Sequence, residues 1–406
     1  MIAFELQLSR VQRLTLTNFR NYQAQGLSLP STEQLADSAA ALGDIVALIG
    51  PNGAGKTNVL EALSLLSPGR GLRGSPWADY ARKSVGTAAE GGAGFSVACD
   101  VATGVGPRAV GIGATNALAD KRQCRLDGQN VRSAHAFAEF LSFVWLTPQQ
   151  DGLFRGAAEE RRRFVDQLAT ALDASYASEW SAYQNSARQR LRLLKEAAAT
   201  GAQADPNWLA ALEDSMARHA TTVAVARRGM VRQLSALAEK GHAPFPGARL
   251  NIDGTAEQAL DTRAAVDVED QLKNMWREER DYDQRYGRTH TGPHRSDFLA
   301  WHSEHGMPAQ DCSTGEQKAM LIAILLSHAQ LIENQRMVRP ILLLDEATAH
   351  LDPDRRMALL EVLRRFGGQC WLTGTDLGAF PGLGPHGPGT QVFDVHNGLI
   401  SPSISN

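Results

Sequence analysis

Eight consecutive residues in the first quarter of the chain have the types and spacing of a phosphate-binding loop. The segment fits G-x-x-x-x-G-K-[ST] at every position and reads Gly50, Pro51, Asn52, Gly53, Ala54, Gly55, Lys56, Thr57. Glycines let backbone N–H groups close around a phosphate, Lys56 would neutralise the β- and γ-phosphates of a bound nucleotide, and the Thr57 hydroxyl would bind Mg²⁺. The alternative is a glycine-rich turn that binds nothing. The apolar run before the loop and the helical spacing after it favour the phosphate loop.

Two acids follow a second apolar run. Ile341–Leu344 consists of four aliphatic residues and is followed by Asp345 and Glu346. Such a run is typical of a strand buried on both faces, and acids at its carboxyl end would lie where α/β proteins bind ligands. We therefore predict that Asp345 joins the Mg²⁺ shell and that Glu346 orients or deprotonates the attacking water. The alternative is an acidic pair that begins a surface loop.

A serine–glycine turn, 313–317, lies upstream of the acidic strand and precedes a helical run. Its Ser313 and Glu316 have the spacing of a capping box. A phosphate loop, this turn, the acidic strand and a short segment at 349–352 follow one another as in ABC-type ATPases. That resemblance implies that Ser313, Gly315 and Gln317 face the γ-phosphate of ATP bound by a second subunit. Capping and phosphate binding are compatible, because a helix N-terminus also offers spare N–H groups.

Nearly the whole chain resembles the RecF family, the SMC-like ATPases of bacterial recombinational repair. The matching segments are 18–22, 50–57, 159–166, 291–297, 313–317, 343–346 and 351–352. The resemblance implies a homodimer that forms with ATP and Mg²⁺ on double-stranded, single-stranded or gapped DNA. It also implies weak DNA-dependent ATP hydrolysis, and partnership with RecO and RecR in DNA repair, replication restart and the SOS response to DNA damage.

The chain departs from the family pattern at two positions. Glu346 stands where a second Asp is common, and Glu316 replaces the usual first Gln of the serine–glycine turn. Gln149 and Gln150, after Pro148, are possible equivalents of the metal-contacting glutamine of ABC-type ATPases, and Gln149 is the candidate Mg²⁺ ligand. Residues 373–376 contain no histidine, whereas transporter ATPases carry their switch histidine there.

The elements that position these motifs predict an α/β fold, an ABC/SMC-type P-loop ATPase head with a mainly helical inserted arm. We expect the head to comprise 1–148 and 291–406 and the arm to comprise 149–290. Strands are expected at 11–19, 45–49, 94–101, 121–126, 143–146, 298–301, 341–344 and 369–373. Helices are expected from 157 onward, from Asp205-Pro206 onward, and at 263–286, 313–334 and 353–366. A hairpin turn is expected at Asp127–Gly128, and irregular loops over much of 86–113.

Composition excludes several classes of protein. The 406 residues carry a net charge of −3, which argues against a uniformly basic nucleic-acid binder but not against a local basic surface. We find no apolar run near the ~20 residues of a membrane span and no basic, secretory-type N-terminus. The 4 cysteines form no metal-binding pair. These features predict a reduced, cytoplasmic protein with no membrane partner.

Basic residues of the arm have two interpretations. Arg188, Arg192 and Lys195 share one helical face, and 161–163 is a run of three arginines. They could contact DNA phosphates, or they could form a solvated surface paired with nearby glutamates, Glu159, Glu160 and Glu196. His294 and Arg295 could likewise approach the nucleotide or subunit interface, or stabilise a turn.

Three other functions remain possible from the sequence. They are the ATPase subunit of a membrane transporter, a DNA-binding scaffold with a vestigial ATPase, and a nuclease with a related head.

Overall fold

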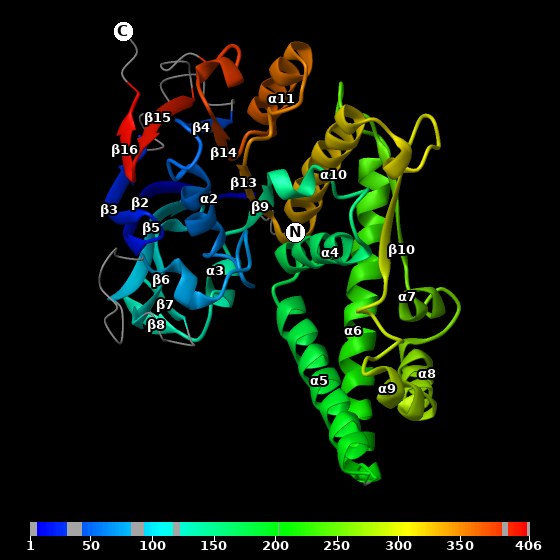
Figure 1. Cartoon of the computed structure of the whole chain (residues 1–406). Coiled ribbons are helices and arrows are strands. Elements are labelled where there is room, and N and C mark those ends of the chain that lie inside the picture. The colour runs from blue at the N-terminus through cyan, green and yellow to red at the C-terminus, as the bar shows by residue number, and fades with distance from the viewer. Residues whose placement is uncertain are drawn as a thin grey trace. The chain divides into compact units, whose positions relative to one another are not determined.

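The computed structural model describes residues 6–30, 43–82, 93–116, 122–201, 203–383 and 389–403. The chain divides into two compact units (Figure 1). The first, here called the sheet unit, comprises 1–151, 242–245 and 313–406. The second, the helical unit, comprises 152–241 and 246–312. It extends 22 residues past the boundary expected at 290, because the strand expected at 298–301 pairs inside this unit rather than with the ATPase sheet.

The main sheet of the sheet unit has the strand order β16-β15-β4-β14-β13-β9. Its strands are β4 (Asp44–Ile49), β9 (Phe143–Leu146), β13 (Ile341–Leu344), β14 (Gln369–Gly374), β15 (Thr390–His396) and β16 (Leu399–Pro402). All neighbours pair in parallel except β15 and β16. The aliphatic run at 341–344 is buried along its whole length, as a central strand requires. The parallel strands therefore end at one edge, directly before the phosphate loop and Asp345.

A second, antiparallel sheet has the order β3-β2-β5-β6-β7-β8. Its strands are β2 (Arg10–Phe19), β3 (Tyr22–Ser28), β5 (Ala93–Thr103), β6 (Gly106–Asn116), β7 (Gln123–Leu126) and β8 (Gln129–Val131). The strand expected at 94–101 is confirmed as part of β5, but the loops expected over the rest of 86–113 are wrong at 106–113, where β6 pairs with β5 in a long hairpin; 83–92 lies outside the described residues. The hairpin turn at Asp127–Gly128 is confirmed, with φ of 50° and 81°.

Helix α2 (Lys56–Ser64) shares one hydrophobic core with both sheets. That core includes Phe19, Val46, Leu60, Val97 and Trp371. Two longer helices complete the unit, α10 (Thr314–Arg336) and α11 (Pro353–Phe366), and they match the helices expected at 313–334 and 353–366. The minor elements are α3 (His135–Ala138), β1 (Gln7–Leu8), which pairs with β12 (Val338–Arg339), and 3₁₀ turns at Trp77–Tyr80, Pro148–Gln150 and Leu377–Ala379.

The helical unit is built around two long helices that lie side by side (Figure 1). They are α5 (Tyr176–Thr200) and α6 (Pro206–Ala238), and Asp205 caps α6 as expected, accepting from the N–H of Asn207 at 2.9 Å. At 1.5 Å per residue α6 is only about 50 Å long, an arm rather than an extended coiled coil. The other elements are α4 (Ala158–Leu172), α7 (Thr255–Ala259), α8 (Ala265–Glu278), α9 (Arg280–Tyr286), β10 (Ala248–Asp253), β11 (Asp297–His302) and the 3₁₀ turn Ala309–Asp311.

Two sequence expectations for this unit need correction. The single helix expected at 263–286 is two helices, α8 and α9, which meet at Glu279. The chain after α6 contains a strand that the sequence analysis did not predict, β10, which pairs antiparallel with β11. No helix in the described part of the chain is long and apolar enough to cross a membrane.

Buried arginines connect the helices of this unit. Arg190 of α5 lies 3.0 Å from Glu213 of α6 and 2.6 Å from Asp283 of α9. Arg227 of α6 lies 2.6 Å from Asp166 of α4. Both guanidinium groups are fully buried, so their carboxylate partners are needed to offset the loss of hydration.

Candidate nucleotide-binding site

The phosphate loop joins β4 to α2 through glycines that no other residue could replace easily. Gly50 has φ of 149°, and a Cβ there would lie 2.2 Å from the carbonyl oxygen of Val395. Gly55 has φ of 117° and begins α2 without any side-chain cap. Because the first N–H groups of an uncapped helix lack internal partners, they are available to an anion. The loop therefore has the backbone geometry that a phosphate group requires.

Lys56 lies inside this loop. Its Nζ donates to the carbonyl oxygens of Gly50 and Pro51, at 2.6 and 2.9 Å. Burial lowers the pKa of Lys56, while the charges of Glu346 and Asp345 act in the opposite direction. A partly desolvated ammonium beside the loop is suited to pair with phosphate oxygens.

The turn between β2 and β3 and the first residue of β3 make hydrogen bonds to the phosphate loop. Asn21 donates from Nδ2 to the carbonyl oxygen of Ala54 at 2.9 Å and accepts from Nδ2 of Asn58 at 2.7 Å. The Tyr22 hydroxyl donates to the carbonyl oxygen of Gly55 at 3.0 Å, and burial raises the pKa of that hydroxyl. The sequence analysis assigned no role to these two side chains. A polar Asn-Tyr pair at the tip of an apolar hairpin was the available signal.

Thr57 and Asp345 come together at the edge of the main sheet. The Thr57 hydroxyl donates to both carboxylate oxygens of Asp345, at 2.9 and 3.0 Å. Burial raises the pKa of Asp345, whereas hydrogen bonds from Thr373 and Thr57 lower it. A hydroxyl and a carboxylate at this separation are hard oxygen donors of the kind that bind Mg²⁺ beside ATP phosphates. The arrangement therefore fits the metal that the sequence predicted at these two residues.

Glu346 and Gln149 lie at the ends of neighbouring strands. Glu346 directly follows Asp345, and its N–H donates to the Thr373 hydroxyl at 2.9 Å. Gln149 is exposed in the 3₁₀ turn after β9, whose Leu146 pairs with Leu344. Both predicted positions thus belong to the same sheet edge as the phosphate loop. Their catalytic and metal-binding roles remain predictions.

The serine–glycine turn forms the N-terminus of α10. Its capping box is confirmed, because the Glu316 N–H donates to Oγ of Ser313 at 3.3 Å and the Ser313 N–H donates to Oε2 of Glu316 at 2.8 Å. Ser313 is exposed and Gly315 half-buried, whereas Gln317 is only 1% exposed. Ser313 and Gly315 are thus accessible to a second molecule. Gln317 instead packs inside the sheet unit.

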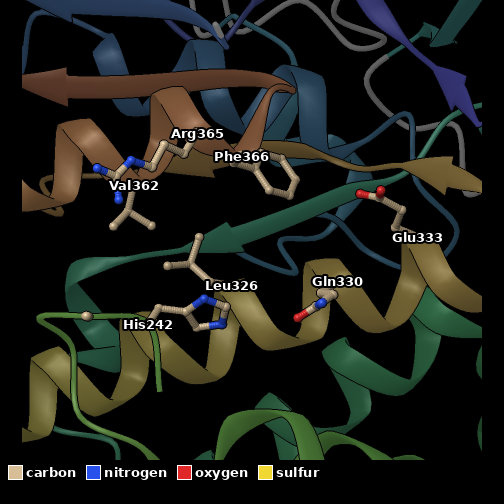
Figure 2. Close-up of a pocket in the computed structure, with 8 residues that line it drawn as sticks. His242, Leu326, Gln330, Glu333, Val362, Arg365 and Phe366 are labelled. Carbon is tan, nitrogen blue, oxygen red and sulfur yellow. The ribbon is translucent and has the colours of Figure 1, made fainter. Parts of the chain in front are cut away.

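A separate cavity of about 400 Å³ lies along the second half of α10. Figure 2 shows its lining, in which His242 and Leu326 face residues of α11, among them Val362 and Phe366. Gln330, also in the lining, follows Ser313 by 17 residues, or about 26 Å of helix. None of the lining residues belongs to the nucleotide motifs.

The basic residues of the helical unit mostly have local partners. Arg161 makes a paired contact with Asp297 at 2.7 Å for each nitrogen, and Arg162 donates to the carbonyl oxygen of Ser296. Arg163 pairs with Glu159, and Arg192 pairs with Glu196 at 2.7 Å. These contacts favour the solvated-surface interpretation for Arg163 and Arg192. The Arg192 side chain is also 78% exposed, as this interpretation requires.

His294 and Arg295 lie within the helical unit and support a turn. His294 is hydrogen bonded to the Tyr183 hydroxyl at 2.5 Å and to the carbonyl oxygen of Thr289 at 2.9 Å. Burial lowers the pKa of His294 to about 4, so its ring is neutral at physiological pH. Arg295 also donates to the carbonyl oxygen of Thr289. These contacts favour the structural interpretation over the nucleotide one.

A parallel sheet with a phosphate loop, an acidic strand end and a capped serine–glycine turn defines a P-loop ATPase head of the ABC/SMC type. Residues 10–373 match the model of the RecF/RecN/SMC N-terminal domain family. The DNA replication and repair protein RecF of Rhizobium rhizogenes is 41% identical over 97% of this chain and 98% of its own length. That of Agrobacterium fabrum is 42% identical over 96% and 98%. The chain belongs to the RecF family.

A solved structure has the same fold. The recombination mediator protein RecF with ATPrS, of the RecFOR pathway, superimposes with a TM-score of 0.82 over 98% of this chain and 100% of that one, at 20% identity.

Proposed function

We propose that this chain is an ATP-dependent DNA-binding protein of recombinational repair that acts in the cytoplasm. It binds ATP and Mg²⁺ at residues 50–57 with Asp345, and Glu346 activates the water for slow hydrolysis that DNA stimulates. The observation that carries the proposal is the placement of the Thr57 hydroxyl 2.9 Å from the Asp345 carboxylate at the end of the phosphate loop. A bound metal would supply Lewis-acid stabilisation of the phosphate oxygens, while Lys56 and the loop N–H groups would hold the phosphates in place.

ATP would also join two copies of the chain. The N-terminus of α10, with exposed Ser313 and half-buried Gly315, would cover the γ-phosphate bound by the other copy. The favourable end of the helix dipole makes this position suitable for an anion. A dimer that closes only with ATP would grip duplex or gapped DNA in a switchable way, and mediators of the RecO and RecR type would then be loaded. The near-full-length RecF relatives favour this function over a transporter subunit.

The test uses three variants. Lys56→Ala removes the phosphate-loop ammonium, Glu346→Gln removes the proposed base, and Lys240→Ala changes an exposed lysine outside the site. Light scattering after gel filtration, with and without ATP and Mg²⁺, reports dimerisation. Fluorescence anisotropy on duplex, single-stranded and gapped DNA, at two salt concentrations, reports DNA binding and its electrostatic component.

Wild type and Lys240→Ala should dimerise with ATP and bind DNA, and Lys56→Ala should do neither. Glu346→Gln should remain dimeric, because ATP is bound but not cleaved. ATP-dependent dimerisation and DNA binding by Lys56→Ala would refute the mechanism, as would a Glu346→Gln variant that binds ATP and stays monomeric. Absence of DNA-stimulated phosphate release from wild type would favour the scaffold with a vestigial ATPase.

A further inference from the structure

A buried lysine links the serine–glycine helix to the acidic strand end. Lys318 is the fifth residue of α10 and is only 2% exposed. Its Nζ donates to Oδ2 of Asp151 at 3.0 Å and to the carbonyl oxygen of Glu346 at 3.2 Å. Because a buried ammonium is strongly disfavoured without partners, these two contacts restrain all three chain segments. The motifs described above assign no task to Lys318.

The backbone of Glu346 needs such restraint. Its φ is 50°, in the left-handed region that residues other than glycine rarely adopt and that persists only where the surroundings impose it. The Thr373 hydroxyl accepts from the Glu346 N–H at 2.9 Å and donates to Oδ1 of Asp345 at 2.7 Å. Lys318 holds the carbonyl on the other side of the same residue. Glu346 is therefore fixed at both of its backbone polar groups.

Asp151 connects the same lysine to the glutamine segment. It directly follows Gln149 and Gln150 and forms an ion pair with Lys318 at 3.0 Å. Its other oxygen, Oδ1, is buried and has no hydrogen-bond partner in the described part of the chain. Lys318 thus compensates part of the charge of this half-buried carboxylate.

We propose that Lys318 is a positioning residue for ATP hydrolysis, which holds the Glu346 backbone so that its carboxylate reaches the attacking water. The proposal rests on the proposed function, in which Glu346 is the base. Lys318 follows the helix cap Ser313 by five residues, about one and a half turns. Any displacement of α10 by ATP of a second copy would therefore reach Glu346 through Lys318. Engagement of the ATP bound by one copy would thus position the carboxylate that activates water at the other ATP.

Four variants separate positioning from simple stabilisation. Lys318→Met removes both contacts, and Lys318→Arg keeps a cationic donor. Asp151→Asn removes the ion pair but leaves Lys318 available to Glu346. The double variant Asp151→Asn/Lys318→Met leaves no unpaired buried charge, so it should fold even where Lys318→Met does not. For each variant, the Tm, the affinity for a fluorescent ATP analogue, and kcat and KM for ATP are measured.

We expect Asp151→Asn to keep kcat within about twofold and Lys318→Arg to restore part of it. The double variant should bind ATP as wild type does, yet have kcat lower by about tenfold to hundredfold, the range that a small misplacement of a reacting group produces. Recovery of both Tm and kcat by the double variant would overturn the proposal, because the lysine would then serve stability alone. A wild-type protein without ATP turnover would refute the proposed function itself, and the positioning role with it.

Discussion

Removal of the Asn21 side chain should weaken ATP binding, although no residue of the phosphate loop itself is changed. Asn21→Ala deletes two hydrogen bonds, one to the carbonyl oxygen of Ala54 and one from Asn58. Each such bond contributes about 0.5–1.5 kcal/mol net, so the loss totals about 1–3 kcal/mol. In the variant, ATP would have to order a loop that is already ordered in wild type. The free energy of ATP binding would be weakened by up to this amount. At 1.4 kcal/mol per factor of ten, the dissociation constant should rise by about fivefold to a hundredfold.

The assay is an equilibrium titration with a fluorescent ATP analogue in the presence of Mg²⁺. Gln23→Ala is the matched control, because it removes an amide side chain at an exposed position of β3, two residues after Asn21. The Tm of each variant confirms that the protein is folded. A folded Asn21→Ala variant with an affinity within about twofold of wild type would refute the reasoning, since the loop would then keep its conformation without this contact.

Three further changes have expected outcomes. Gly55→Ala should abolish ATP binding, measured by the same titration, because φ is 117° and the new Cβ would lie 2.4 Å from Nδ2 of Asn21. Arg227→Leu should lower the free energy of urea unfolding by about 3–5 kcal/mol, because it leaves the Asp166 carboxylate without its buried partner. Asp345→Asn should raise the Tm of the nucleotide-free protein near pH 7. Its carboxyl has a raised pKa in the folded state, so the charged form costs stability above the unfolded pKa. Scanning calorimetry should show the gain disappearing at low pH, where the carboxyl is neutral in both states.

Each of these changes has a control at a nearby or equivalent position. Gly74→Ala would place its Cβ 3.9 Å from that of Arg70, an ordinary contact, and should keep ATP binding, although φ is also positive there. Arg228→Leu removes a partly exposed ion pair with Asp261, which should cost about 0–1 kcal/mol. Asp376→Asn changes an exposed carboxylate and should leave the Tm unchanged. Equal effects in the variant and its control would contradict the corresponding argument.

Motifs whose parts are close in sequence could be predicted without the structure. The phosphate loop, the capping box of Ser313 and Glu316, and the Asp205 cap each depend on residues within a single turn or loop. For these, residue type and spacing decide the local backbone. The α/β class followed from apolar runs that end in glycine or acidic residues.

Contacts between distant segments could not be predicted in this way. Examples are the hydrogen bond from Asn21 to Ala54 and those from Lys318 to Asp151 and Glu346. They join residues between 28 and 167 positions apart. A single sequence does not indicate which of its distant segments come into contact. Lys318 did carry one usable signal, since a charged residue at the start of the apolar run 319–326 must find a buried partner. Strand β10 escaped recognition because its partner β11 lies more than 40 residues later.

The interleaved strand order has a consequence for synthesis of the chain. In the main sheet, β4 has β14 and β15 as its neighbours, and β9 pairs with β13. The ribosome therefore synthesises β4 and β9 well before the strands with which they pair. Thr57 and Asp345 are 288 positions apart, which corresponds to about 15–60 s of translation at about 5–20 residues per second. During that interval, β4 would present two unpaired edges, a hazard that chaperones would need to cover. A prematurely terminated product would lack Asp345, so it could not assemble the complete nucleotide site.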